Sequence, residues 1–126
     1  MKITQAQRVT NKINHEVDFT EQVSCDNVGR YVVSVKNVFT GTLPSHNPMM
    51  LSLVTEALAS CMGLWADSVG GWKDKATGIY YVDINVNAEY KSDAITLALG
   101  LDEIAIYDLL EEKEINVEQY VKETLL

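Results

Sequence analysis

The clearest pattern of apolar residues in the chain runs from Met49 to Asp67. Apolar side chains there occupy nearly every side of a helix, which is typical of a buried helix rather than one on the surface. Pro48 suits the first turn of such a helix, and the Gly70-Gly71 pair follows its expected end. The pattern therefore predicts one long helix, about 28 Å at roughly 1.5 Å per residue, that crosses the core.

A narrow polar seam interrupts this helix. Ser52, Glu56 and Ser60 are four residues apart, so they lie on one face. Glu56 is the single charged residue in the apolar part of the helix, and a buried carboxylate is costly unless it is paired or used in chemistry. We therefore take Glu56 as a candidate catalytic residue. The structural alternative is that it satisfies backbone N–H groups or pairs with Arg30 or a lysine.

Alternating apolar and polar residues predict strands on both sides of the helix. Strands are predicted for residues 17–24, 30–39, 79–90, 95–101, 104–107 and, in preference to a helix, 115–126. The first two flank turn-forming residues at 26–29 and predict a hairpin. The strictest alternation lies at 95–101. Residues 1–17 suit a short helix or a strand, and 70–78 suit a polar turn.

The expected order is thus a hairpin, one long helix and a run of antiparallel strands. A single sheet wrapped around the helix would bury it on every side. This is the layout of the hot-dog fold, so the sequence predicts an α+β chain with an antiparallel sheet around a long central helix. A length of 126 residues predicts a single hot-dog domain over residues 1–126.

Composition and charge narrow the range of partners. The chain is 47% apolar and 22% charged, and its formal charge is -8. Nucleic acid and anionic membranes both require a basic surface, so neither is expected as a partner. Residues 1–18 contain no apolar signal segment, and the two cysteines lack disulfide-framework or metal-ligand spacing. We expect a cytoplasmic protein with reduced thiols, without a metal or another cofactor.

The loop before the helix is a second candidate for a site. Residues 40–48 contain both prolines of the chain and one of its two histidines, His46. Loops positioned by a rigid scaffold often carry binding and catalytic residues. We therefore expect this loop and the helix seam to act together.

Three short motifs, taken in order, resemble those of bacterial β-hydroxyacyl-ACP dehydratases. Residues 29–38 are similar to the strand that precedes the active-site loop of that family. Gly41-Thr42-Leu43-Pro44 resembles its Gly-His-Phe-Pro motif, and Val54–Ser60 resembles its helix motif Val-Glu-Ala-Leu-Ala-Gln. The resemblance covers residues 23–68 well and the later strands only loosely.

The resemblance implies an acyl-thioester site shared by two subunits. In that family a histidine removes a proton from C2, and the helix carboxyl group of the partner subunit helps the C3 hydroxyl leave as water. Glu56 matches the carboxyl group, whereas Thr42 stands at the histidine position. His46 is the candidate replacement base, and the alternative is that it is a solvent-exposed loop histidine. The expected substrate contacts are Thr42, Leu43, Pro44, Ser52 and Ser60.

The resemblance further implies a homodimer or larger homo-oligomer that acts on acyl-ACP or acyl-CoA in fatty acid or polyketide-type lipid metabolism. Docking of an acidic carrier protein would need a basic patch, for which the candidates are Arg30, Lys36, Lys73 and Lys75. Two alternatives within the same fold are a thioesterase, in which Glu56 activates water, and a non-catalytic acyl-binding partner subunit.

A remote alternative comes from Ala57–Cys61, which resembles the peroxidatic helix of organic-hydroperoxide reductases of the osmotically inducible type. Those proteins carry a second cysteine on a later helix, and no cysteine follows Cys61 here. A role for Cys61 as a small core residue is therefore favoured over a role as a nucleophile.

Overall fold

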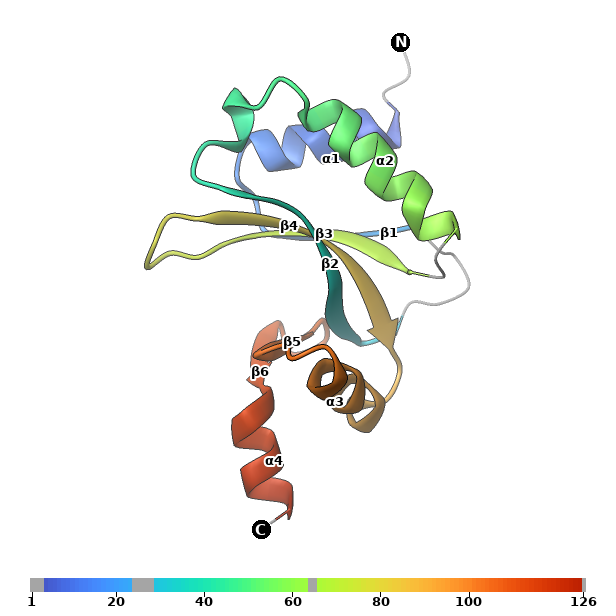
Figure 1. Ribbon diagram of the computed structural model, residues 1–126, viewed down its shortest axis with the longest axis vertical. Helices are drawn as coiled ribbons and strands as arrows, with labels where there is room; N and C mark the ends of the chain where they lie inside the picture. The colour runs from blue at the N-terminus through green and yellow to red at the C-terminus, as the bar shows by residue number, and fades with distance from the viewer. Residues whose placement is uncertain (1–3, 24–28, 64–65, 126) are drawn as a thin grey trace.

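The computed structural model describes residues 4–23, 29–63 and 66–125 and has the predicted α+β class (Figure 1). Within these ranges, four α-helices accompany a six-stranded antiparallel sheet. The helices and one 3-10 turn are α1 (Gln5–Asn14), η1 (Pro44–His46), α2 (Met50–Gly63), α3 (Lys91–Gly100) and α4 (Val117–Leu125). The strands are β1 (Phe19–Gln22), β2 (Tyr31–Gly41), β3 (Ser68–Lys73), β4 (Tyr80–Ala88), β5 (Ala105–Asp108) and β6 (Lys113–Asn116).

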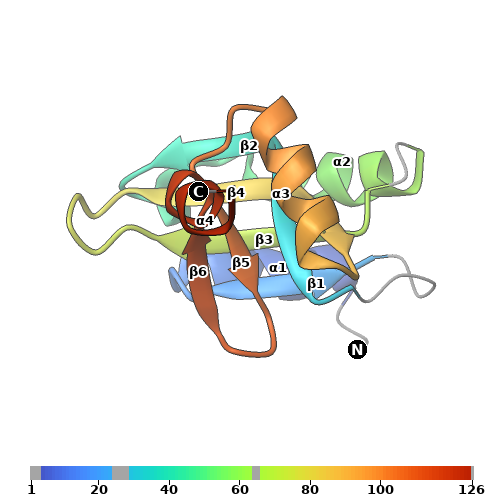
Figure 2. The same ribbon diagram turned by 90° about the horizontal axis from the view of Figure 1, so that it is seen from below.

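The long strand β2 organises the sheet. The strand order is β1-β3-β4-β2-β5-β6, so β2 has β4 on one side along most of its length and β5 on the other side at its start. The β2–β4 register shifts twice, between Ser34 and Lys36 and between Asn37 and Phe39, and such irregularities bend a strand. The sheet curls as a result, and from below β5 and β6 lie in front of β3 (Figure 2).

The predicted hairpin between residues 17–24 and 30–39 is wrong, because the strands formed there are not neighbours. β1 pairs with β3, with Phe19 opposite Gly71, while β2 pairs with β4 and β5. Most of the predicted turn at 26–29 lies outside the described residues. β3 occupies part of the stretch predicted as a polar turn, so the glycine pair lies within a strand.

Two hydrophobic clusters fill the space between the elements. One packs α1 and α2 against β3 and β4, and its buried members are Val9, Ile13, Met50, Val54, Ala57, Leu58, Cys61, Ala66, Val69, Val82 and Ile84. The other packs α3 and α4 against β5 and the start of β2, and its buried members are Tyr31, Val33, Ala94, Ile95, Ala98, Ile106 and Val117. β2 and β4 extend from the region of one cluster to the region of the other.

The N-terminal segment, for which the sequence suited either a helix or a strand, forms the helix α1. It begins with a capping box, in which Thr4 Oγ1 accepts a hydrogen bond from Gln7 N at 3.1 Å and Gln7 Oε1 accepts one from Thr4 N at 3.0 Å. Val9 and Ile13, four residues apart, are fully buried on the side that faces the sheet and α2.

α2 corresponds to the predicted central helix, but only one of its sides is covered. Val54, Ala57 and Cys61 are buried. The opposite side is exposed and consists of Leu51, Ser52, Thr55, Glu56 and Ala59. The single chain therefore does not enclose this helix on all sides. The helix ends at Gly63 rather than Asp67, and residues 64–65 lie outside the described ranges.

Two segments predicted as strands are helical. Residues 95–101 lie mostly in α3, where Ala94, Ile95 and Ala98 are buried at helical spacing. The alternation was misleading because Thr96, Ala98 and Gly100 separate the larger apolar residues as in a strand, while Ala94 and Ala98 are four residues apart and lie on one face of a helix. The segment from Ile115 begins as strand β6 and then becomes α4, with Asn116 Oδ1 accepting a hydrogen bond from Gln119 N at 2.8 Å as a helix cap.

We expect Gly71→Ala to lower the free energy of unfolding by roughly 1–3 kcal/mol, the usual cost of overpacking. A Cβ at this position would run into the Tyr80 hydroxyl and the Phe19 ring. That hydroxyl donates a hydrogen bond to the Val17 carbonyl at 2.6 Å, which a displaced ring would lose. Chemical denaturation measures the difference. Gly100→Ala is the control, because no described atom lies within 4 Å of a Cβ there; an equal loss in both variants would contradict the prediction.

Candidate binding site

The loop predicted to contribute to a site lies on the outer surface. Pro44 is buried and begins η1, whereas Thr42, Leu43 and His46 are exposed. His46 N donates a hydrogen bond to the Leu43 carbonyl at 3.0 Å, which closes the turn. These side chains are not among those that border the hollow beside Glu56.

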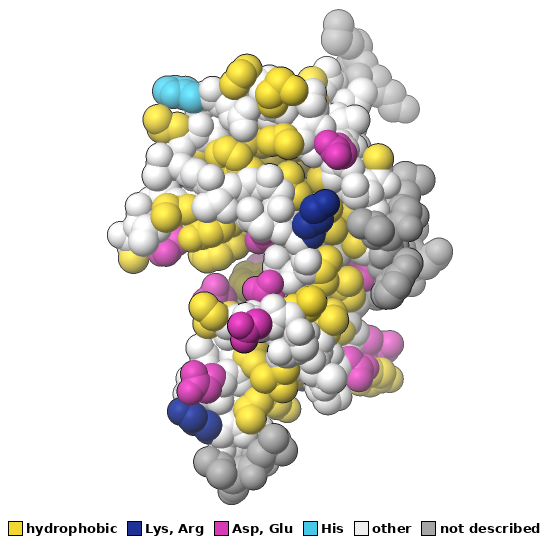
Figure 3. Space-filling view, viewed as in Figure 1, with side chains coloured by type: hydrophobic (Ala, Val, Ile, Leu, Met, Phe, Trp, Pro, Cys, Tyr) yellow, Lys and Arg dark blue, Asp and Glu magenta, His cyan; other side chains and the backbone are white. Residues whose placement is uncertain are grey.

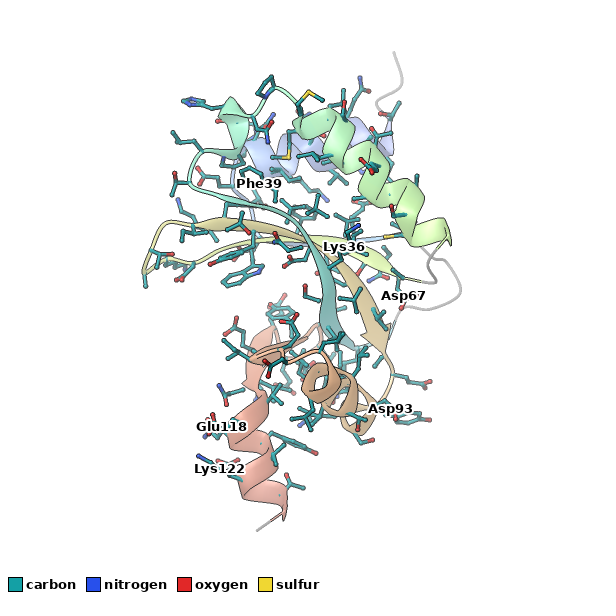
Figure 4. All side chains as sticks on the ribbon, in the orientation of Figure 1. Lys36, Phe39, Asp67, Asp93, Glu118 and Lys122 are labelled. Atoms are coloured by element: carbon teal, nitrogen blue, oxygen red, sulfur yellow. The ribbon has the colours of Figure 1, made fainter. Side chains whose placement is uncertain are left out.

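The helix seam borders a small hollow between α2 and β2. Glu56 and Ser60 line it from the helix. Lys36, labelled in Figure 4, lines it from β2. Its volume is about 130 Å³, below the roughly 300 Å³ of the smallest typical ligand pockets. Ser52 and Glu56 are exposed. In the single chain, the predicted site residues on the helix and those on the loop therefore do not surround one cavity.

The surroundings of Cys61 argue against a peroxidatic role. The thiol is buried, and burial together with the negative charge of Asp67 raises its pKa. Its Sγ lies 3.7 Å from the Ser68 carbonyl oxygen, to which it donates. A reactive cysteine needs an accessible and stabilised thiolate, and this environment disfavours one. Cys25 lies outside the described residues.

Arg30 has a partner other than Glu56. Its Nε donates to Asp108 Oδ1 at 2.7 Å and its Nη2 to Asp108 Oδ2 at 2.8 Å, which forms a bidentate ion pair. The hydrogen bonds from this guanidinium hold the pKa of Asp108 well below its usual range. The ion pair joins the start of β2 to the end of β5 and thereby fixes β5 to the sheet next to β2.

An open cleft of about 1320 Å³ lies on the sheet face opposite α1 and α2. Figure 3 shows the molecule hollowed at its waist, with acidic side chains around the opening. β4 separates the two faces: Tyr81, Asp83 and Asn85 line the cleft, while Val82 and Ile84 pack in the first hydrophobic cluster. The opposite wall comes from β5, β6 and the residues just before β5.

Two aromatic rings form a platform in this cleft. Trp72 of β3 and Tyr81 of β4 are opposite each other in the sheet, and their rings stack with centroids 4.6 Å apart and planes 16° apart. Trp72 remains 40% exposed. A stacked pair that leaves part of its surface open to the cleft can accept a further planar group.

A carboxylate lies next to this platform. Asp83 follows Tyr81 on the same face of β4, and Asn37 Nδ2 donates to its Oδ1 at 2.9 Å. Thr40 Oγ1 in turn donates to Asn37 Oδ1 at 3.0 Å, which orients the amide. Burial raises the pKa of Asp83 despite hydrogen bonds from Asn37, Trp72 and Ser34. Burial and the charge of Asp83 also raise the pKa of Glu103, on the opposite wall.

Acidic side chains outnumber basic ones around the cleft. The seven acidic residues that line it are Asp18, Asp74, Asp83, Asp102, Glu103, Glu112 and Glu114. The four lysines are Lys36, Lys73, Lys75 and Lys113. Three of these lysines belong to the basic patch predicted for a carrier protein, so that patch lies among an excess of carboxylates.

Sequence reasoning did not select Trp72, Tyr81 or Asp83 as site residues. The signal that could have found two of them is the alternation along residues 80–88, where polar and aromatic side chains occupy one face of an otherwise apolar strand. Trp72 lay in a stretch predicted as a turn, so its pairing with Tyr81 was not visible.

Comparisons with protein-family models, curated proteins and solved structures found no match to this chain. Among the described residues, no helix has the length and apolar character needed to cross a membrane. The same residues contain no group of three or more His, Cys, Asp or Glu side chains arranged to hold a metal ion. The cleft and the hollow are therefore the two features from which we infer a function.

We expect Asp83→Asn to be more stable than the wild type at neutral pH. Because burial raises the pKa of Asp83, the folded chain binds this proton more tightly than the unfolded chain does. The stabilisation from Asp83 is therefore complete below the unfolded pKa and is lost as the pH rises through the folded pKa. The advantage of the variant should shrink as the pH falls, as measured by chemical denaturation over a series of pH values.

Asp108→Asn is the matched comparison, for which the expected change in stability has the opposite sign. Arg30 lowers the pKa of Asp108, so its stabilisation is present above the unfolded pKa and is lost as the pH falls through the folded pKa. This variant should be less stable than the wild type at neutral pH, and the difference should narrow in acid. A loss of stability in Asp83→Asn at neutral pH would show that hydrogen bonding, rather than burial, dominates at Asp83.

Proposed function

We propose that the protein is a binding module that takes a basic polypeptide segment of a partner protein into the cleft. The observation that carries the proposal is the exposed Trp72–Tyr81 pair next to the Asp83 carboxylate. An arginine guanidinium stacks on aromatic faces and forms paired hydrogen bonds with carboxylates. The two kinds of group therefore fit one arginine side chain.

The dimensions of the cleft favour a polypeptide over a small molecule. Its volume of about 1320 Å³ exceeds the roughly 300–1,000 Å³ of typical small-ligand pockets. The cleft is also open, and residues from all six strands line it. An extended segment can contact several of these strands at once.

The charge of the protein favours a basic partner. The chain carries a formal charge of -8, and carboxylates are in excess around the cleft. Such a field attracts cationic partners and speeds their association, and it does so less at high ionic strength. A cation next to Asp83 and Glu103 would also relieve the repulsion between these two carboxylates.

Acyl-thioester binding in a hot-dog-like fold is the second candidate function. A specific observation favours it: Glu56 and Ser60 of the predicted seam share a hollow with Lys36. The antiparallel sheet is curled, and α2 lies across one of its faces, which is compatible with a hot-dog-like arrangement. A working site would require a larger enclosed space than this hollow, for which a second subunit would have to cover α2.

We expect an arginine-rich peptide to bind, and a glutamate-rich peptide of equal length not to bind, in isothermal titration calorimetry at low salt. Asp83→Asn should weaken this binding about tenfold, which corresponds to about 1.4 kcal/mol. Trp72→Ala should weaken it between about twofold and thirtyfold, through loss of a cation–π contact worth about 0.5–2 kcal/mol. Added salt should weaken binding in every variant.

Asp93→Asn is the control for the loss of one negative charge. Asp93 is exposed on α3, away from the cleft (Figure 4). If Asp93→Asn weakens binding as much as Asp83→Asn does, the attraction comes from net charge alone and the cleft is not the site. Equal binding of the glutamate-rich peptide would also contradict the proposal.

The second candidate predicts turnover of a 3-hydroxyacyl thioester to the enoyl thioester, or release of free thiol from a saturated acyl thioester. For a dehydratase, His46→Ala and Glu56→Gln should each abolish enoyl formation while the chain stays folded, because the two side chains would act as base and acid. Product formation and circular dichroism measure the two effects. Unchanged dehydration in His46→Ala would exclude His46 as the base. Activity that appears only in Thr42→His would indicate a chain that binds the thioester without a base.

A further inference from the structure

The outer face of α2 exposes apolar side chains with few charges around them. We define this face by Met49, Leu51, Ser52, Thr55, Glu56 and Ala59. Met49 is 58% exposed and Leu51 45%. Large apolar side chains gathered on one exposed face often mark an interaction surface, whereas scattered ones do not.

The charge pattern sets this face apart from the rest of the protein. Between Lys36 and Asp67, Glu56 is the single Asp, Glu, Lys or Arg residue, although the chain as a whole has a formal charge of -8. Two copies of an acidic chain repel each other over most of their surface. The outer face of α2 is where they can approach with the least repulsion.

We propose that a second copy of this chain packs on the outer face of α2, with the two copies related by a two-fold axis. A two-fold contact must be complementary to itself. The border of this face meets that requirement, because Glu56 and Lys36 line one hollow and carry opposite charges. A surface specialised for a strongly charged foreign partner would instead show an excess of one sign.

The side chains at the middle of the face suit close contact between two helices. Ser52, Thr55 and Ala59 are small, and the distance between packed helices depends on the side chains at the contact. Leu51 and Met49 would supply the apolar area. The outer face of α2 lies on the side of the sheet opposite the cleft, so the cleft stays open in the dimer and the two proposals fail independently.

Sedimentation velocity over the micromolar range tests the proposal. The wild type should sediment as a dimer, with twice the mass of one chain. Leu51→Glu should raise the dissociation constant of this dimer about tenfold or more. Leu110→Glu is the matched control, because Leu110 is 70% exposed and lies beyond β5, away from α2. A monomeric wild type, or equal weakening by both substitutions, would overturn the proposal.

Cross-linking provides a second measurement that does not depend on a destabilising charge. Thr55→Cys should form a covalent dimer under mild oxidation, whereas Thr96→Cys should not. The two threonines are matched: both are exposed on helices, and each donates its hydroxyl hydrogen bond to the carbonyl four residues earlier, at 2.7 Å in Thr55 and 2.9 Å in Thr96. Equal cross-linking of the two variants, or none in Thr55→Cys, would count against the two-fold contact.

Discussion

The arrangement of the molecule depends on how β2 pairs with its two neighbours. β4 follows β2 along most of its length, and β5 pairs with only its first two residues, Tyr31 and Val32. The bidentate contact between Arg30 and Asp108 strengthens this short junction. Because β2 bends at its register shifts, β5 and β6 turn back toward β3 instead of extending the sheet outward. The cleft is the space that this turn leaves, so it would be lost if the strand were straight.

The sequence predicted the local elements that depend on a single strong pattern. The helix α2, the strand β4 and the short strand β5 all lie where their apolar patterns place them. The strand prediction failed for residues 95–101, because the segment fits two periods. Ile95, Leu97 and Leu99 alternate as in a strand, whereas Ala94, Ile95 and Ala98 form the buried face of a helix. Prediction from the sequence also failed for contacts distant in sequence. Neither the pairing of β1 with β3 nor that of Arg30 with Asp108 leaves a local signal.

The cleft could not be predicted for the same reason, and its residues show a conflict between stability and binding. Asp83 is held in an environment that raises its pKa, which means that the charged carboxylate costs stability at neutral pH. A residue selected for stability alone would be an amide or an apolar side chain at this position. A cationic group bound next to the Trp72–Tyr81 pair would compensate for the lost solvation of Asp83.

The two faces of the sheet thus differ in a way that separates their roles. The cleft face combines aromatic rings with an excess of negative charge, whereas the α2 face is apolar and nearly neutral. The negatively charged cleft faces of two copies would repel each other, so the cleft would stay available to a basic partner. The acyl-thioester interpretation depends on the other face, because Glu56 is exposed until a second chain covers it. Only a second chain packed over this face would enclose Glu56 in a site from which water is excluded. The oligomeric state is therefore the property that must be known before a catalytic role for Glu56 can be judged.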